Sequence, residues 1–69
     1  MNPSIEHVLQ FFAFEHLPPH LAAISQPFHA LANEVAGMAD NPETTVALRK
    51  LLEAKDAAVR AVIAKGASR

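Results

Sequence analysis

The side chains in this sequence with the clearest capacity for chemistry are four histidines, so metal binding is the first chemistry to consider. These residues are His7, His16, His20 and His29. His16 and His20 have the spacing of two ligands on one helical face, but the prolines between them disrupt that register. No cysteine or close carboxylate completes a recognisable zinc pattern. We therefore expect no metal site, and we interpret the histidines as surface or interface residues.

Nucleophilic catalysis has little support in the sequence. Thiol chemistry is excluded because the chain has no cysteine. Ser4, Ser25 and Ser68 lack the context of a nucleophile elbow, and there is no glycine-rich loop to hold a triphosphate. We expect no catalytic residue, no cofactor and a protein that is not an enzyme.

Two arginines in the C-terminal half are candidates for binding an anion. Arg49 and Arg60 share a narrow helical stripe with Glu53 and Asp56, and the i,i+4 spacings predict the pairs Arg49–Glu53 and Asp56–Arg60. In that interpretation the arginines belong to a solvated salt-bridge stripe. In an oligomer where such stripes converge on an axis, the guanidinium groups would instead gather and bind phosphates.

Three of the four phenylalanines lie close together near the N-terminus. Phe11, Phe12 and Phe14 are too close in sequence to share one helical face, so at least one must point away from the local core. Such a ring either packs in a hairpin or subunit contact, or offers a stacking platform to a planar ligand such as a nucleobase.

The element that organises these residues is a long helix over residues 42–65. Asn41 is a good N-cap, Pro42 suits the first helical position and Gly66 supplies the stop. Lys55 falls inside the apolar face of this helix, so its stem either extends along that face to solvent or its ammonium group faces an anionic ligand or an interfacial carboxylate. That face comprises Leu48, Leu51, Leu52, Val59, Val62 and Ile63, and alanines extend it at positions 47, 54, 57, 58 and 61.

Two further helices precede the long one. Residues 4–14 fit a short helix capped by Ser4, and residues 18–39 fit a second helix that Pro27 should kink or split, with Ser25 or Gln26 as a cap. The short turn before Asn41 makes the second and third helices antiparallel neighbours. We therefore expect an all-α fold with a short N-terminal helix and an αα-hairpin. The residues expected to face the long helix are Leu21, Ile24, Phe28, Leu31, Val35 and Met38.

The length and composition predict that this small domain assembles with copies of itself. Residues 1–69 form a single domain of a size at which a lone core stabilises a fold by only about 3–5 kcal/mol. There is no disulfide to supplement it, and the long helix has more apolar circumference than one neighbour can cover. A net charge of −1 argues against DNA binding, no apolar run could span a membrane, and the absence of a secretory signal fits the cytoplasm.

Three segments together resemble the hairpin domain of phage-encoded cyclic-nucleotide sponges, the anti-CBASS and related anti-Thoeris sponges. They are residues 41–60 (NPETTVALRKLLEAKDAAVR), 14–21 (FEHLPPHL) and 25–28 (SQPF). The similarity spans residues 4–62, and the chain looks more like the compact anti-CBASS type, which is one hairpin domain and little else.

The resemblance implies a homo-oligomer, characteristically a hexamer, that sequesters cyclic dinucleotides or trinucleotides without cleaving them. Family members place an N-terminal aromatic residue and a polar or basic residue of the Ser-x-Pro-Phe turn at a dinucleotide pocket between subunits. Those positions fall near Phe11 or Phe14 and on Gln26, where many relatives carry a lysine. The trinucleotide pocket of the family uses arginines near the oligomer axis, which implies Arg49 or Arg60 here.

Two threonines at the start of the long helix complete the set of candidate ligand-binding residues. Thr44 and Thr45 lie beside free backbone N–H groups, where they are placed to hydrogen-bond phosphates.

One alternative function is that of a structural or adaptor oligomer that docks a protein partner on its alanine-rich face, with the nucleotide pocket lost through Gln26. Another is a sponge for cyclic ADP-ribose isomers.

Overall fold

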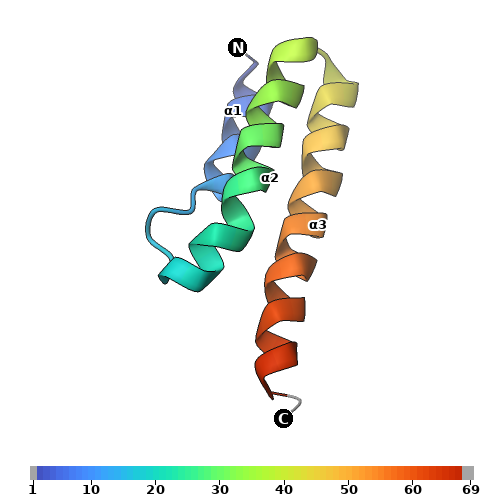
Figure 1. Ribbon diagram of the computed structural model, residues 1–69. Helices are drawn as coiled ribbons and strands as arrows, with labels where there is room; N and C mark the ends of the chain where they lie inside the picture. The colour runs from blue at the N-terminus through green and yellow to red at the C-terminus, as the bar shows by residue number, and fades with distance from the viewer. Residues whose placement is uncertain (1, 68–69) are drawn as a thin grey trace.

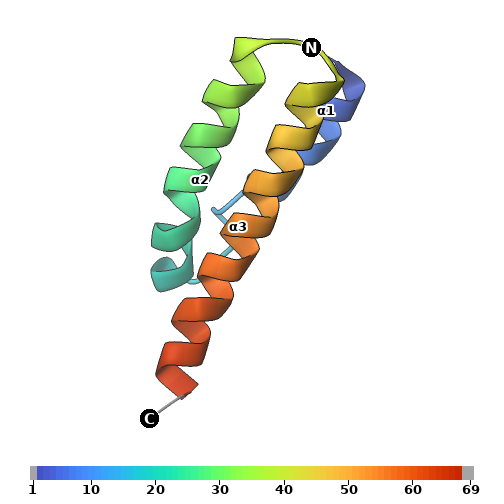
Figure 2. The same ribbon diagram turned by 90° about the vertical axis from the view of Figure 1, so that its right-hand side faces the viewer.

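The computed structural model describes residues 2–67, and every regular element in this range is helical (Figure 1). The elements are α1 (Pro3–Leu9), the 3₁₀ helix η1 (Gln10–Phe12), α2 (Pro19–Met38) and α3 (Pro42–Ala67). α2 and α3 run antiparallel, and α1 lies alongside them near the hairpin turn (Figures 1 and 2). The predicted all-α class with an N-terminal helix and an αα-hairpin is therefore confirmed, whereas the assembly of copies stays a prediction.

Two helices begin at the same dipeptide, an asparagine followed by a proline. The Asn2 side chain accepts a hydrogen bond from the Ser4 N–H at 2.8 Å, and the Asn41 side chain accepts one from the Thr44 N–H at 3.1 Å. In each case the proline occupies the first helical turn, where its missing N–H would have had no partner. The prediction that Ser4 caps the first helix is wrong, because Asn2 performs that role.

The first helix is shorter than the predicted segment 4–14. Regular α-helix ends at Leu9, the single tighter turn of η1 carries the chain to Phe12, and Ala13 is already extended with ψ of 140°. The chain has to reverse direction before α2 begins at Pro19, so the helix ends sooner than its apolar spacing indicated. Phe14 consequently lies outside the helix, in the connection to α2.

The second helix continues through Pro27 without interruption. A proline removes one N–H from the helical ladder, and here the remaining hydrogen bonds keep the element whole. The predicted split is therefore wrong, whereas the alternative of a kink at Pro27 stays a prediction. Ser25 does not act as a cap either, since it is fully buried and its hydroxyl has no hydrogen-bond partner among residues 2–67. α3 likewise continues past the predicted stop at Gly66, because a glycine costs only about 1 kcal/mol inside a helix.

The buried face of α2 agrees with the predicted one only in part, since Phe28 and Val35 do pack against the core. Leu31 and Met38 were expected against the long helix, yet their side chains are 43% and 75% exposed. The buried face is wider on the side that meets α1 and η1, whose packing the sequence pattern of α2 alone does not include. The buried positions of α2 are instead the small residues Ser25, Ala32 and Ala36.

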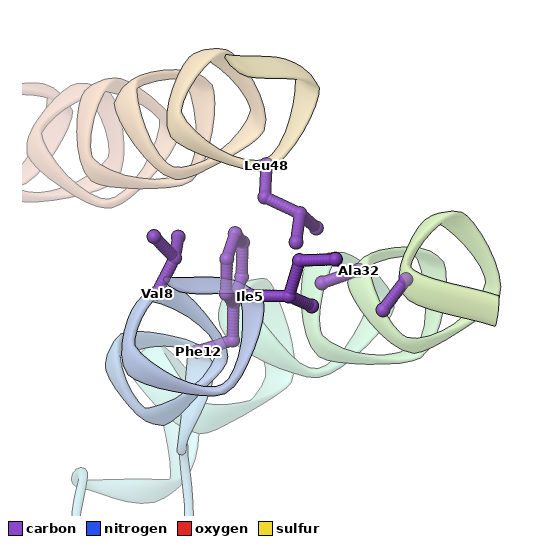
Figure 3. Packing of buried hydrophobic residues seen from close by; sticks show 6 residues of the cluster. Ile5, Val8, Phe12, Ala32 and Leu48 are labelled. Atoms are coloured by element: carbon purple, nitrogen blue, oxygen red, sulfur yellow. The ribbon is translucent and has the colours of Figure 1, made fainter. Parts of the chain in front are cut away.

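The core takes half of its fully buried apolar residues from the N-terminal segment. Ile5, Val8 and Phe12 point from α1 and η1 toward the hairpin, where they meet Leu48 of α3 (Figure 3). Ala32 and Ala36 form the α2 side of this cluster, and their small side chains leave room for the Phe12 ring. α1 is therefore an integral part of the core.

The folded chain is a rod with dimensions of 44 × 20 × 16 Å. α3 is the longest element, and its last turns extend beyond the start of α2 in both views (Figures 1 and 2). Ile63, near the end of α3, is 53% exposed. Among the described residues, no helix combines the length and apolar character that a membrane span requires.

Candidate functional site

The aromatic ring of Phe11 is partly exposed to solvent, and contacts with neighbouring residues restrain it. It follows Gln10 in η1, and its side chain is 49% exposed. The edge of the ring meets the His7 imidazole at a centroid distance of 5.4 Å and an interplanar angle of 84°. The Gln10 amide contacts His7 Nδ1 in turn at 3.1 Å. The exposed ring therefore has a fixed neighbour on one edge.

The backbone of Phe11 is held by a side chain that is distant in sequence. Lys55 of α3 donates a hydrogen bond from Nζ to the Phe11 carbonyl oxygen at 3.0 Å, and the same nitrogen lies 3.1 Å from Asp56 Oδ1. Only 12% of the Lys55 side chain is exposed. The sequence-based alternatives for Lys55 did not include this arrangement: the ammonium group has polar partners inside the chain, one of them at the end of η1, where carbonyl groups lack helical partners.

A second aromatic contact joins the connection after η1 to the middle of α2. The Phe14 ring lies against the His29 imidazole at a centroid distance of 5.2 Å and an angle of 73°. The Asn33 amide donates to the His29 carbonyl oxygen at 2.9 Å and lies 3.5 Å from His29 Nε2. Gln26 is exposed one helical turn before His29, so Phe14 and Gln26 lie on the same side of α2.

Glu15 adds a negative charge beside this cluster. Its carboxylate accepts a hydrogen bond from the Phe14 N–H at 3.2 Å. Hydrogen bonds from the backbone of Glu15 and Phe14, and then the charges of His29 and His16, lower the pKa of Glu15 below its ordinary value of 4.5. The Phe14–His29 surface therefore combines aromatic, imidazole, amide and carboxylate groups.

The two threonines at the start of α3 have different environments. Thr44 is buried, and its hydroxyl donates to the Ala39 carbonyl oxygen at 2.9 Å and contacts Asn41 Oδ1 at 3.3 Å. The structure therefore uses the Thr44 hydroxyl to close the hairpin turn. Thr45 is half-buried and remains the more accessible of the pair.

Arg49 and Arg60 are both exposed on α3, and neither forms an ion pair within residues 2–67. The predicted Arg49–Glu53 and Asp56–Arg60 pairs are wrong, since Glu53 pairs with Lys50 at 3.7 Å and Asp56 with Lys55. Glu53 takes an i,i+3 partner in place of the i,i+4 one, and Asp56 pairs with the residue directly before it, whose ammonium group also reaches the Phe11 carbonyl oxygen. Exposed ion pairs differ little in energy, so spacing alone did not decide the pairing. Both guanidinium groups are consequently available to an external anion.

The structure brings together only part of the predicted set. Phe14 and Gln26 share one side of α2, whereas Arg49 and Arg60 are three helical turns apart, about 16 Å along the axis of α3. The threonines lie at the hairpin turn, about 18 Å along α2 from Gln26. Neither a cavity nor a cluster of three metal-ligating side chains is found within residues 2–67.

Two residues of this surface and one contact were not predicted from the sequence. His29 was treated as an ordinary surface residue, Glu15 was given no role, and the partner of Lys55 was not identified. The signal for Lys55 was present, because a cation inside an apolar helical face requires a partner. No sequence signal pointed to the Phe11 carbonyl, since that contact joins positions 44 residues apart.

Comparison with protein-family models, curated proteins and solved structures finds no match to this chain.

Proposed function

We propose that this chain is a non-enzymatic sponge that binds cyclic di- and trinucleotides between the subunits of a homo-oligomer. In this role it would sequester the messengers of CBASS-type antiphage signalling in the host cytoplasm. The resemblance of residues 4–62 to the hairpin domain of phage sponges supports the proposal. The single structural observation that carries it is the exposed Phe11 ring, whose backbone is held by Lys55 and whose edge is held by His7.

The separation of the candidate residues supports binding between subunits. The surfaces around Phe11, Phe14 and Arg60 could each form one side of a binding pocket, but no part of the same chain forms the opposite side, since residues 2–67 enclose no cavity. A second copy would provide the missing side, and the half-exposed apolar residues Leu31 and Ile63 would lose water in such a contact.

The chemistry of each surface suggests which ligand it serves. The Phe11 ring offers a face for stacking a base of a cyclic dinucleotide, a contact worth about 1–3 kcal/mol per base. Gln26 and Phe14 provide an amide and a second ring on the side of α2. The unpaired guanidinium groups of Arg49 and Arg60 suit the three phosphates of a cyclic trinucleotide where copies of α3 meet around an axis.

Calorimetric titration with cyclic di- and trinucleotides tests this function. We expect heat and saturation with at least one of them, no turnover of the ligand, and a mass in solution above that of one chain. Phe11→Ala should weaken dinucleotide binding, and Arg60→Ala should weaken trinucleotide binding more than dinucleotide binding. No heat from any member of the panel, with the oligomer intact, would contradict the proposal.

The same measurements also test two alternative functions, an adaptor oligomer and a sponge for cyclic ADP-ribose isomers. The exposed alanines at positions 57 and 61 also suit an adaptor oligomer that docks a helical protein partner on the alanine-rich face of α3. Capture of a stoichiometric partner protein, together with a silent nucleotide titration, would favour the adaptor. Cyclic ADP-ribose isomers belong in the titration panel, since saturation by one of them alone would assign the sponge to that class of messenger.

A further inference from the structure

Lys55 occupies a position where an apolar residue would be the simpler choice. It lies on the same helical face as Leu48 and Val59, with its stem buried and 12% of the side chain exposed. Replacing a buried, paired charge by an apolar residue of similar volume is often neutral or stabilising. A contribution to net stability therefore does not account for a lysine at this position.

The two contacts of the ammonium group indicate what the lysine adds. Asp56, on the same helix, balances its charge at 3.1 Å, and the remaining directed contact is the 3.0 Å hydrogen bond to the Phe11 carbonyl oxygen. That bond joins α3 to the single turn of η1, shortly before the chain becomes extended at Ala13. It fixes the backbone of Phe11 at the point where helical hydrogen bonds end.

We propose that Lys55 is a positioning residue that holds the Phe11 ring in its exposed orientation for stacking on a nucleobase. The inference rests on the proposed function, because it assigns Lys55 a role in the same binding surface. The His7 contact restrains the ring edge, and the Lys55 bond restrains the peptide from which the ring projects. Ligand binding then requires less ordering of the aromatic residue, which raises affinity without any contact between Lys55 and the ligand.

The test compares three full-length variants with the unmodified chain, using 3′,3′-cyclic GMP–AMP as the calorimetric probe. Lys55→Met removes the donor, Lys55→Arg keeps a cationic donor, and Lys50→Met is the matched control on the exposed side of α3. We expect Lys55→Met to weaken binding by up to about tenfold with an unchanged Tm and oligomer mass, since the cost of ordering the Phe11 residue then falls on the binding step. Lys55→Arg should stay within about threefold of the original Kd, as Lys50→Met should.

Equal affinity of Lys55→Met and the unmodified chain would overturn the proposal. So would failure of Lys55→Met to fold, because that result assigns the lysine to stability, and so would a Lys55→Arg variant as weak as Lys55→Met.

A ligand-free measurement separates failure of this inference from failure of the proposed function. The chain contains no tryptophan, so Phe11→Trp introduces a single fluorophore at the position in question. We expect Lys55→Met to lower the fluorescence anisotropy of Trp at this position at constant oligomer mass, and Lys50→Met to leave it unchanged. If no cyclic nucleotide binds the unmodified chain, the function fails while the anisotropy still decides the role of Lys55. Equal anisotropy in the presence and absence of Lys55 overturns the positioning role itself.

Discussion

Ser25 and Thr44 are both buried, and their hydroxyl groups differ in whether they form a hydrogen bond. The Thr44 hydroxyl donates to the Ala39 carbonyl oxygen, whereas the Ser25 hydroxyl has no partner among residues 2–67. An unpaired buried hydroxyl costs about 1–3 kcal/mol, and its removal relieves that cost. The two positions therefore form a matched pair with opposite expected signs.

We predict that Ser25→Ala raises the free energy of unfolding by about 1 kcal/mol, aided by the higher helix propensity of alanine. Thr44→Val should lower it by about 1–2 kcal/mol, because the Ala39 carbonyl loses its partner. Urea denaturation followed by circular dichroism measures both changes. Shifts of the same sign in the two variants would contradict this account.

Glu15 makes stability depend on pH in a defined direction. Folding lowers the pKa of its carboxyl group, through backbone hydrogen bonds first and the charges of His29 and His16 second. A carboxyl group with a depressed folded-state pKa stabilises the fold above its unfolded value of 4.5, and that contribution is lost as the pH falls through the folded-state value.

We predict that Glu15→Gln lowers the Tm at pH 6 and that its deficit shrinks as the pH falls below 4.5, where the original carboxyl group also becomes neutral. Thermal unfolding between pH 3 and pH 6 measures the difference. Glu34→Gln, on the exposed side of α2, is the control for a general change in net charge. Curves for the Glu15 variant and the unmodified chain that run parallel across this range would exclude a role for Glu15.

At the scale of elements, α1 with η1 is the part on which the core depends. Phe11 and Phe12 are adjacent in sequence, but Phe12 is fully buried while Phe11 is half-exposed. We predict that Phe12→Ala costs about 3–5 kcal/mol, close to the whole stability expected of so small a domain, and leaves the chain largely unfolded. Phe11→Ala should cost less than about 1 kcal/mol. Circular dichroism at 25 °C distinguishes them, and comparable helicity in both variants would show that the N-terminal segment is dispensable.

The elements themselves were largely readable from the sequence. Helix formers, prolines and the Asn41–Pro42 start predicted α3, and alternating apolar residues predicted α2. The ends of α1 were not predicted correctly, because the Asn2–Pro3 start was overlooked in favour of Ser4. The buried face of α2 was partly misplaced because periodicity within one helix does not reveal that a third helix covers it.

The candidate site was less predictable than the fold. The crowding of three phenylalanines predicted that at least one ring points away from the core, but not that this ring is Phe11. The arginines were expected in ion pairs that the structure does not form within residues 2–67. The Lys55–Phe11 contact and the Phe14–His29 pair join residues far apart in sequence, so neither spacing nor composition could identify them. Long-range contacts of this kind follow from packing, which local pattern does not encode.

At the scale of the whole molecule, the surplus of small apolar residues on α3 is still uncovered in the single chain. Ala57 and Ala61 are both exposed, as are Ala47 and Ala54. We predict that Ala57→Gln lowers the mass in solution toward the 7.4 kDa of one chain while helicity is retained, because a large side chain prevents close approach of another helix. Light scattering and circular dichroism measure the two properties. Lys50→Gln is the control, and an unchanged mass for Ala57→Gln would mean that this face is not an interface.

The elongated shape places the first turn of α1 and the last turns of α3 at opposite ends of the rod (Figures 1 and 2). Dyes attached near Asn2 and near Lys65 on different copies would consequently report the relative direction of neighbouring rods. Antiparallel neighbours would place the Asn2 end of one copy beside the Lys65 end of the other, and energy transfer between the two labels would be strong. Neighbours pointing the same way would keep unlike ends apart by most of the 44 Å length, and transfer would be weaker.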